Sequence, residues 1–361
     1  MVNRIRPNRD AQTVSRREFL RAAGVVGAGA VLLGACGSDG GKATPADTPG
    51  IAVDPPPETT TIRLGKYTNL PRTAPFFLAE QFLPAEGFTD VRYVEVAESD
   101  QGLQQIAAGE IDIGLFIPAP LTVAVDRGDP LVVLAGVHSS LFEIFGGDRV
   151  QSLRDLKGKR IAGTRDPTEP GYSFWAAFLA YVGIDFETEV EFVASVGAGD
   201  LITQARAGTI DVWQGTRPLT TGFRAAKIGH VLIDGLVDPP WSQYFMGMAA
   251  GNRDFVAKHP AATKRALRAI LKATDVCAKE PERAARYLVD KGYTQVTYES
   301  TLDAIPGRAY TAWREFEPED TIRFYALRLK EAGLVKGTPD DLIARATDWR
   351  YLNEIKRELA V

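Results

Sequence analysis

The stretch QIAAGEIDIG at residues 105–114 decides the fold, because part of it occurs twice in the chain. The pattern Ala-Gly-x-Ile-Asp, followed by an aliphatic residue, returns at residues 207–212, so that Gly109 and Gly208 are 99 positions apart. Each glycine is expected to end a helix, because glycine readily adopts the left-handed backbone found there. The aspartates that follow, Asp112 and Asp211, lie between apolar strand residues, and we expect both to be framework residues that bond to neighbouring backbone.

Further matches at the same offset show that a larger unit is repeated. Residues 91–96 correspond to 190–195, and residues 132–136 correspond to 231–235. Each copy predicts strand, helix, strand, helix, short strand, helix and strand. Helices that connect successive strands imply crossover connections and a parallel sheet. The sequence therefore predicts two α/β lobes with a hinge and a cleft between them.

The lobe boundaries follow from the extended stretches that leave and re-enter the first copy. We expect the first lobe to comprise residues 61–146 and 242–361, and the second lobe to comprise residues 147–241. The helical C-terminal part, from Pro260 onward, is expected to pack on the first lobe. On one of its helices, Cys277 falls on an apolar face and is predicted to be an inert core thiol.

The composition excludes several classes of protein. A net charge of −4 gives no indication of nucleic-acid binding, and two cysteines cannot form a disulfide framework. The three histidines are scattered, and no cluster has the spacing of a metal site. No phosphate-binding glycine loop or nucleophile signature is present. We therefore predict a protein without cofactor or metal that is not an enzyme.

The N-terminus predicts export. Residues 15–20, SRREFL, form a twin-arginine signal, and the apolar run that follows is shorter than a membrane-spanning helix. Small residues before Cys36 resemble the lipobox of bacterial lipoproteins. This resemblance implies removal of residues 1–35, lipidation of Cys36 and a protein anchored to the extracytoplasmic face of the membrane. Residues 36–60, rich in Gly, Ser, Thr, Asp and Pro, are expected to form a disordered tether.

Three features together resemble one family of transport proteins. They are Ala-Pro-x-x-x-Ala-Glu at residues 74–80, Leu-x-Asp-Leu-Lys-Gly-Lys-x-Ile at residues 153–161, and the two Ala-Gly-x-Ile-Asp copies. Their order is similar to that of the nitrate/sulfonate/taurine solute-binding proteins of ABC importers, a group related to binders of thiamine-pyrimidine precursors. The resemblance implies a type II periplasmic-binding-protein fold, a ligand in the cleft, hinge closure, and delivery to a membrane permease.

Candidate ligand contacts follow the predicted strands of both lobes, where ligands bind in open α/β sheets. Helix N-termini at several of these positions favour an anion. The candidates in the first lobe are Tyr67, Asn69, Thr73, Ala74, Ser99, Asp100, Pro118 and His138; those in the second lobe and the return crossing are Thr164, Gly171, Tyr172, Ser173, Thr216, Arg217, Trp241 and Tyr244.

Four candidates have a second interpretation. Arg217 either pairs with an anionic ligand group in bidentate fashion or is a solvated surface arginine. Trp241 and Tyr244 either stack on a planar ligand or pack near the hinge. His138 either touches ligand or is a polar loop residue.

The resemblance and the candidate residues favour a monomeric extracytoplasmic solute-binding lipoprotein for a small organic or inorganic anion, such as a sulfonate, taurine, nitrate or a carboxylate. The alternatives are a binder of a pyrimidine-like heteroaromatic molecule, an enzyme on the same fold such as a pyrimidine-precursor synthase, and a sensor that presents ligand to a membrane receptor. The identity of the ligand is left open by the sequence.

Overall fold

The computed structural model describes residues 54–359, apart from residues 68–69, 97–98, 168 and 196 and the side chains of residues 99, 100 and 170. The chain divides into two units, Met1–Ala52 and Val53–Val361, and the description below concerns the second. The expected signal peptide, Cys36 and the first part of the expected tether lie outside the described residues. Among the helices of the described part, none is long and apolar enough to cross a membrane.

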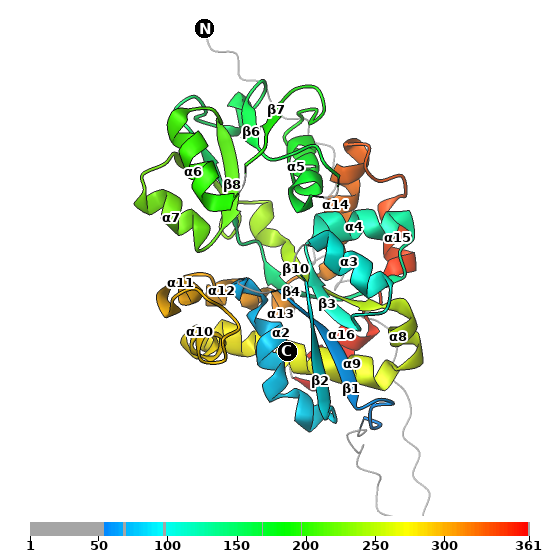
Figure 1. Cartoon of the computed structure of the whole chain (residues 1–361). Helices are drawn as coiled ribbons and strands as arrows, with labels where there is room; N and C mark the ends of the chain where they lie inside the picture. Colours follow the sequence, from blue (N-terminus) through cyan, green and yellow to red (C-terminus); the bar gives the residue numbers. More distant parts are fainter. Residues whose placement is uncertain (1–53, 68–69, 97–98, 168, 196, 360–361) are drawn as a thin grey trace, which may run out of the picture. The chain divides into compact units, whose positions relative to one another are not determined.

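The described residues form two five-stranded sheets of corresponding strand order (Figure 1). The first sheet has the order β2-β1-β3-β10-β4, with β1 (Thr61–Lys66), β2 (Asp90–Glu95), β3 (Ile113–Phe116), β4 (Leu131–Ser139) and β10 (Phe245–Asn252). The second sheet has the order β7-β6-β8-β5-β9, with β5 (Phe142–Gly146), β6 (Arg160–Ala162), β7 (Glu191–Val193), β8 (Val212–Thr216) and β9 (His230–Asp234). The matching orders confirm that a common unit is used twice.

The crossing strands make both sheets mixed rather than purely parallel. Strand β5 pairs antiparallel with β8 and β9, and β10 pairs antiparallel with β3 and β4. The expected boundary at residue 146 assigned β5 to the first lobe, whereas the structure pairs it within the second sheet. The chain therefore leaves the first sheet between Ser139 and Phe142, before β5 begins.

Three helices accompany the strands of each copy. In the first lobe they are α2 (Ala74–Leu78), α3 (Ser99–Ala107) and α4 (Pro118–Arg127); in the second they are α5 (Pro170–Tyr181), α6 (Gly197–Ala207) and α7 (Leu219–Ala225). Short 3₁₀ turns at Pro71–Thr73, Ala79–Gln81, Leu83–Glu86, Leu153–Asp155 and Trp241–Gln243 complete the connections. At the turn Leu153–Asp155, Ser152 and Asp155 form the capping box that starts it, and the bonds from the backbone N–H groups of Gln151 and Ser152 to Asp155 are 3.0 and 2.9 Å long.

The C-terminal helices cover the first lobe and reach the second. They are α8 (Arg253–Lys258), α9 (Pro260–Lys279), α10 (Pro281–Asp290), α11 (Tyr298–Asp303), α12 (Gly307–Tyr310), α13 (Ala312–Glu315), α14 (Pro318–Glu331), α15 (Pro339–Ala346) and α16 (Arg350–Glu358). As expected, α9 packs on α2 and α16, and α12 and α13 pack on β4. Helix α14 also packs on α5 of the second lobe (Figure 1). Cys277 is completely buried on α9, and burial raises the pKa of its thiol.

The two copies of the opening motif perform the same structural task. Gly109 and Gly208 have φ angles of 75° and 64°, as expected for residues that follow a helix. The carboxylate of Asp112 accepts the backbone N–H of Arg63 at 2.7 Å, and that of Asp211 accepts the backbone N–H of Arg160 at 3.0 Å. Asp112 thus ties the segment before β3 to β1, and Asp211 ties the segment before β8 to β6, which confirms the framework role.

The packed part of the chain begins before the first strand. Asp54, inside the range expected as tether, pairs with Lys264 at 2.7 Å. Glu58 accepts the backbone N–H groups of Ala261 and Ala262 at 3.0 and 2.9 Å. These bonds satisfy donors in the first turn of α9, which have no partner within the helix. Residues 54–58 are therefore held on α9.

Candidate ligand-binding site

A cavity of about 270 Å³ lies where strand ends of the two sheets meet α5 and the C-terminal helices. Its lining combines one arginine, polar groups from β8 and a larger number of apolar side chains: Arg72, Ile117, Phe142, Gly171, Phe174, Gln214, Gly215, Thr216, Leu219, Met246 and Tyr325. Ligands of open α/β folds bind at such strand ends. The cavity is therefore the candidate site.

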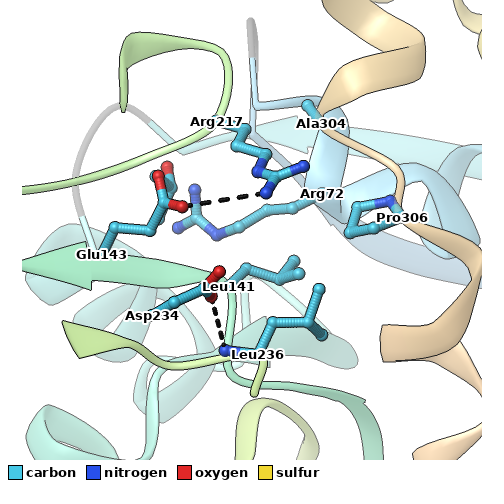
Figure 2. A pocket seen from close by; sticks show the side chains of 9 residues that line it. Arg72, Leu141, Glu143, Arg217, Asp234, Leu236, Ala304 and Pro306 are labelled. Carbon is cyan, nitrogen blue, oxygen red and sulfur yellow. Dashed lines mark hydrogen bonds and ion pairs between the residues drawn. The ribbon is translucent and has the colours of Figure 1, made fainter. Parts of the chain in front are cut away.

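A smaller pocket of about 10 Å³, whose lining residues Figure 2 draws, shares Arg72 and Thr216 with this cavity. A volume of about 10–15 Å³ on this measure holds roughly one water molecule. The small pocket is therefore too small for a solute. Its importance is that it holds charged side chains of both lobes next to the candidate site.

The side chain of Arg72 is the unusual group of the site. It is half-buried, and among the described residues no carboxylate forms an ion pair with it. Burial lowers the pKa of Arg72 from its ordinary value, while the nearby hydroxyls of Tyr310 and Tyr67 act in the opposite direction. An arginine stays protonated in proteins. Arg72 is thus a partly desolvated cation without a counter-ion in the described part of the chain.

Two neutral polar groups lie near this cation. Tyr67 is 5 % exposed, and its hydroxyl has no hydrogen-bond partner among the described residues. Burial raises the pKa of Tyr67, while the charge of Arg72 acts in the opposite direction. His138 is 1 % exposed, and burial lowers its pKa to about 4. At neutral pH both groups are uncharged, so neither offsets the charge of Arg72.

His138 lies in a strand rather than in a loop. Its Nδ1 is 2.9 Å from the carbonyl oxygen of Ser139 in β4, and because a carbonyl only accepts, Nδ1 carries the proton. Its Nε2 is therefore an acceptor, and it has no partner within the described structure. An added Cβ at Gly247 of β10 would lie 2.2 Å from Nε2. The buried His138 ring thus fills the space beside Gly247 that any larger side chain at position 247 would need.

Arg217 is already paired with carboxylates. Its guanidinium lies 3.7 Å from Glu143 and 3.5 Å from Asp303. Glu143 is 2 % exposed and accepts two further bonds from Arg224, one of them 2.8 Å long (Figure 2 shows Glu143 beside Arg217). Burial raises the pKa of Glu143, but the bonds from Arg224 outweigh it and hold that pKa below its usual range. The charge of Arg217 is compensated, unlike that of Arg72.

The structure brings part of the predicted set together. Gly171 and Thr216 line the candidate cavity, and Arg217 lines the small pocket next to it. Tyr172 and Ser173 lie on α5 and line a separate cavity of about 370 Å³ against α3 and α4. Asn69 and the side chains of Ser99 and Asp100 lie outside the described residues.

Other predicted residues have framework positions. Ala74 and Pro118 are buried in the first lobe, where Ile117 rather than Pro118 lines the cavity. Thr73 precedes α2 but does not cap it, because its hydroxyl donates to the carbonyl oxygen of Leu70 at 2.8 Å. Thr164 accepts the backbone N–H of Asp166 at 3.0 Å and lines an open pocket within the second lobe.

The two aromatic candidates pack near the hinge. Trp241 is buried and stacks on Phe178 of α5 with ring centroids 5.3 Å apart. Tyr244 stacks on Phe324 of α14 at 4.4 Å. Neither residue lines the candidate cavity, and both rings pack on aromatic side chains near the hinge.

Sequence reasoning did not identify the side chains that dominate the cavity. Arg72 stands within the loop after the first strand, beside residues that were selected, and its positive charge was the available signal. The sequence pattern predicts Phe142 in a strand and Phe174 in a helix. Tyr325 belongs to a helix far along the chain. Nothing local distinguishes these three aromatic residues from core residues.

Comparison with known proteins identifies the family. The family described as NMT1/THI5 like matches residues 71–284, more than half of the chain. The bicarbonate-binding protein CmpA of Synechococcus elongatus is 28% identical over 313 residues, which cover 76% of this chain and 67% of CmpA.

Solved structures have the same fold. The periplasmic nitrate-binding protein NrtA from Synechocystis PCC 6803 aligns with a TM-score of 0.63 and 17% identity, over 84% of this chain and 90% of that one. The alkanesulfonate-binding protein SsuA from Xanthomonas axonopodis pv. citri, bound to MOPS, aligns with a TM-score of 0.59 and 17% identity, over 82% and 100%. The fold is that of periplasmic binding proteins, and the expected resemblance is confirmed. With two repeated lobes, a cavity at their strand ends and a family match over most of both lobes, the chain belongs to the NMT1/THI5-like family.

Proposed function

We propose that this protein is the solute-binding component of an ABC importer and that it captures a small anion in the candidate cavity. The observation that carries the proposal is Arg72, a partly buried cation without a carboxylate partner in the described part of the chain. Removing an unpaired charge from water is costly, and an anionic ligand would offset that cost. The names of the relatives, which are binding proteins for bicarbonate, nitrate and alkanesulfonate, support the same class of ligand.

The lining of the cavity suits capture between two lobes. Gln214 and Thr216 come from β8 of the second lobe, whereas Ile117 and Arg72 come from the first. A ligand that contacts both sets would stabilise the closed arrangement, which is the usual consequence of hinge closure around a ligand. The closed protein would then be recognised by the permease and release its ligand there.

The N-terminal pattern supports the place of action. The twin-arginine signal and Cys36 favour export and a lipid anchor on the outer face of the cell membrane, with a monomeric binding protein held near its permease. Mass spectrometry of the membrane-associated protein would show a lipidated Cys36 as the N-terminal residue. A soluble product that retains residues 1–35 would contradict this part of the proposal.

Ligand binding is tested by thermal unfolding and calorimetry of the purified protein with sulfonates, carboxylates, nitrate, bicarbonate and neutral pyrimidines. A ligand at 100 times its Kd should stabilise the protein by about 2.7 kcal/mol. The proposal expects stabilisation by at least one anion and its loss in Arg72→Met. Stabilisation by neutral pyrimidines alone would favour the heteroaromatic alternative, and turnover of a bound compound would favour an enzyme.

A further inference from the structure

The size of the candidate cavity does not fit an inorganic oxyanion. On the measure by which about 10–15 Å³ holds one water molecule, the cavity of about 270 Å³ has room for many water molecules. An anion of four or five atoms beside Arg72 would leave most of this space to water. The molecule that fills the cavity is therefore larger than nitrate or bicarbonate.

The chemistry of the lining defines the rest of that molecule. Phe142 and Phe174 are buried, and their rings are held edge to face with centroids 4.9 Å apart. Met246 and Tyr325 contribute further buried apolar surface from β10 and α14. Fixed apolar walls favour an apolar body, because burying it releases water from both surfaces.

The polar groups of the lining define the head of the molecule. The side chains of Gln214 and Thr216 lie on β8 at the edge of the cavity, and neither is hydrogen-bonded to another residue within the described structure. An amide and a hydroxyl suit a head group with several oxygens. Of the arginines at the site, Arg72 alone lacks a carboxylate in the described part of the chain, since Arg217 and Arg224 share Glu143. Because Arg72 is the one arginine at the site without a carboxylate partner in the described structure, we expect the ligand to carry one negative charge.

We propose that the ligand is an organic monoanion, a carboxylate or a sulfonate, whose compact apolar body is about the size of a six-membered ring. Its charged head lies at Arg72 and its body lies against Phe142 and Phe174. This inference rests on the proposed function, because it specifies the ligand of the same site.

The test is a matched series of probes measured by calorimetry on the purified protein. Benzoate, cyclohexanecarboxylate and benzenesulfonate carry a head and a body; acetate, nitrate and bicarbonate carry a head only; benzamide carries a body without charge; phthalate carries a second charge. We expect the best member of the first group to bind at least tenfold more tightly than each of the other probes.

Two variants separate the contributions of head and body. Arg72→Met should reduce the affinity for the best monoanion at least 100-fold. Phe174→Ala should reduce it about tenfold, while Phe186→Ala, a buried aromatic change elsewhere in the second lobe, should leave it within twofold. Unliganded melting curves check that each variant is folded.

The outcomes distinguish this inference from the proposed function. If nitrate, bicarbonate or acetate binds as tightly as the ring-bearing anions, the organic body is refuted and anion capture stands. If benzamide binds as tightly as benzoate and Arg72→Met has no effect, both fail. If no probe of any group binds, the anion-capture proposal itself is overturned.

Discussion

Asp303 joins the C-terminal helices to the second lobe through Arg217. The carboxylate of Asp303, at the end of α11, lies 3.5 Å from the Arg217 guanidinium and also accepts a hydrogen bond from the hydroxyl of Thr221 in α7. Both partners belong to the second lobe, next to Thr216 of the candidate cavity. The contact can therefore hold the lobes together at the edge of the site.

Asp303→Asn should weaken this contact and favour opening of the lobes. Since the ion pair is partly exposed, its contribution is about 1 kcal/mol, which corresponds to roughly a fivefold loss of ligand affinity. Calorimetry measures the affinity, and small-angle scattering should show a larger radius of gyration without ligand. Asp290→Asn on the exposed end of α10 serves as the control. An unchanged affinity and radius would show that Asp303 does not hold the lobes.

Arg72→Met should separate stability from function. The change removes a partly desolvated cation that has no carboxylate partner in the described structure, so the unliganded protein should become more stable by about 1 kcal/mol. The same change should abolish stabilisation by anions. Urea unfolding with and without ligand measures both effects. Arg92→Met, at an exposed residue paired with Asp90 on the edge strand β2, is the control and should change neither measurably.

A loss of unliganded stability in Arg72→Met would mean that the guanidinium is compensated within the protein. That result would remove the main argument for anion capture. The test is informative because the two interpretations of Arg72 predict shifts of opposite sign.

The repeated motif shows how much of the fold the sequence predicts. Asp112 and Asp211 recur with their glycines, so one interpretation had to account for both, and each accepts a backbone N–H in its own lobe. The strand order follows from the same repeat. The lobe boundary was misplaced because β5 has the pattern of any buried strand, and only its pairing with β8 and β9 decides which sheet contains it.

The site was less predictable because it depends on contacts between distant segments. For Tyr244 the sequence left ligand stacking and packing near the hinge open, and in the structure the ring stacks on Phe324 of α14. For Arg217 the sequence left an anion partner and a solvated surface arginine open, whereas the structure pairs it with Glu143 and Asp303. Conversely, Arg72 is prominent only because nothing in the described structure neutralises it. Such competition between partners cannot be read from local patterns.

The framework aspartates should matter for stability and not for affinity. Asp112→Asn removes the charge that pairs with Arg63 and weakens the bond to its backbone N–H, in a position that is almost completely buried. Since Arg63 is partly exposed, we expect a loss of about 2 kcal/mol, and a similar loss in Asp211→Asn. Urea unfolding measures the loss, and calorimetry on the folded variants should give unchanged affinities. Asp148→Asn, in an exposed turn, is the control. A large loss of affinity in either framework variant would instead assign its aspartate to the site.

His138 should make the protein less stable in mild acid. Burial lowers its pKa to about 4 from an ordinary value of 6.5. Between these values the unfolded chain binds a proton that the folded protein does not, so the stability contributed by neutral His138 is present above pH 6.5 and is lost as the pH falls toward 4. The full loss is roughly 3 kcal/mol at 1.36 kcal/mol per pH unit. His138→Leu, compared with the exposed His230→Leu, should flatten the dependence of Tm on pH between 6.5 and 4.5. If the variant and the wild-type protein lose Tm in parallel over this range, another group is responsible, and the ring of His138 is accessible to protons in the folded protein.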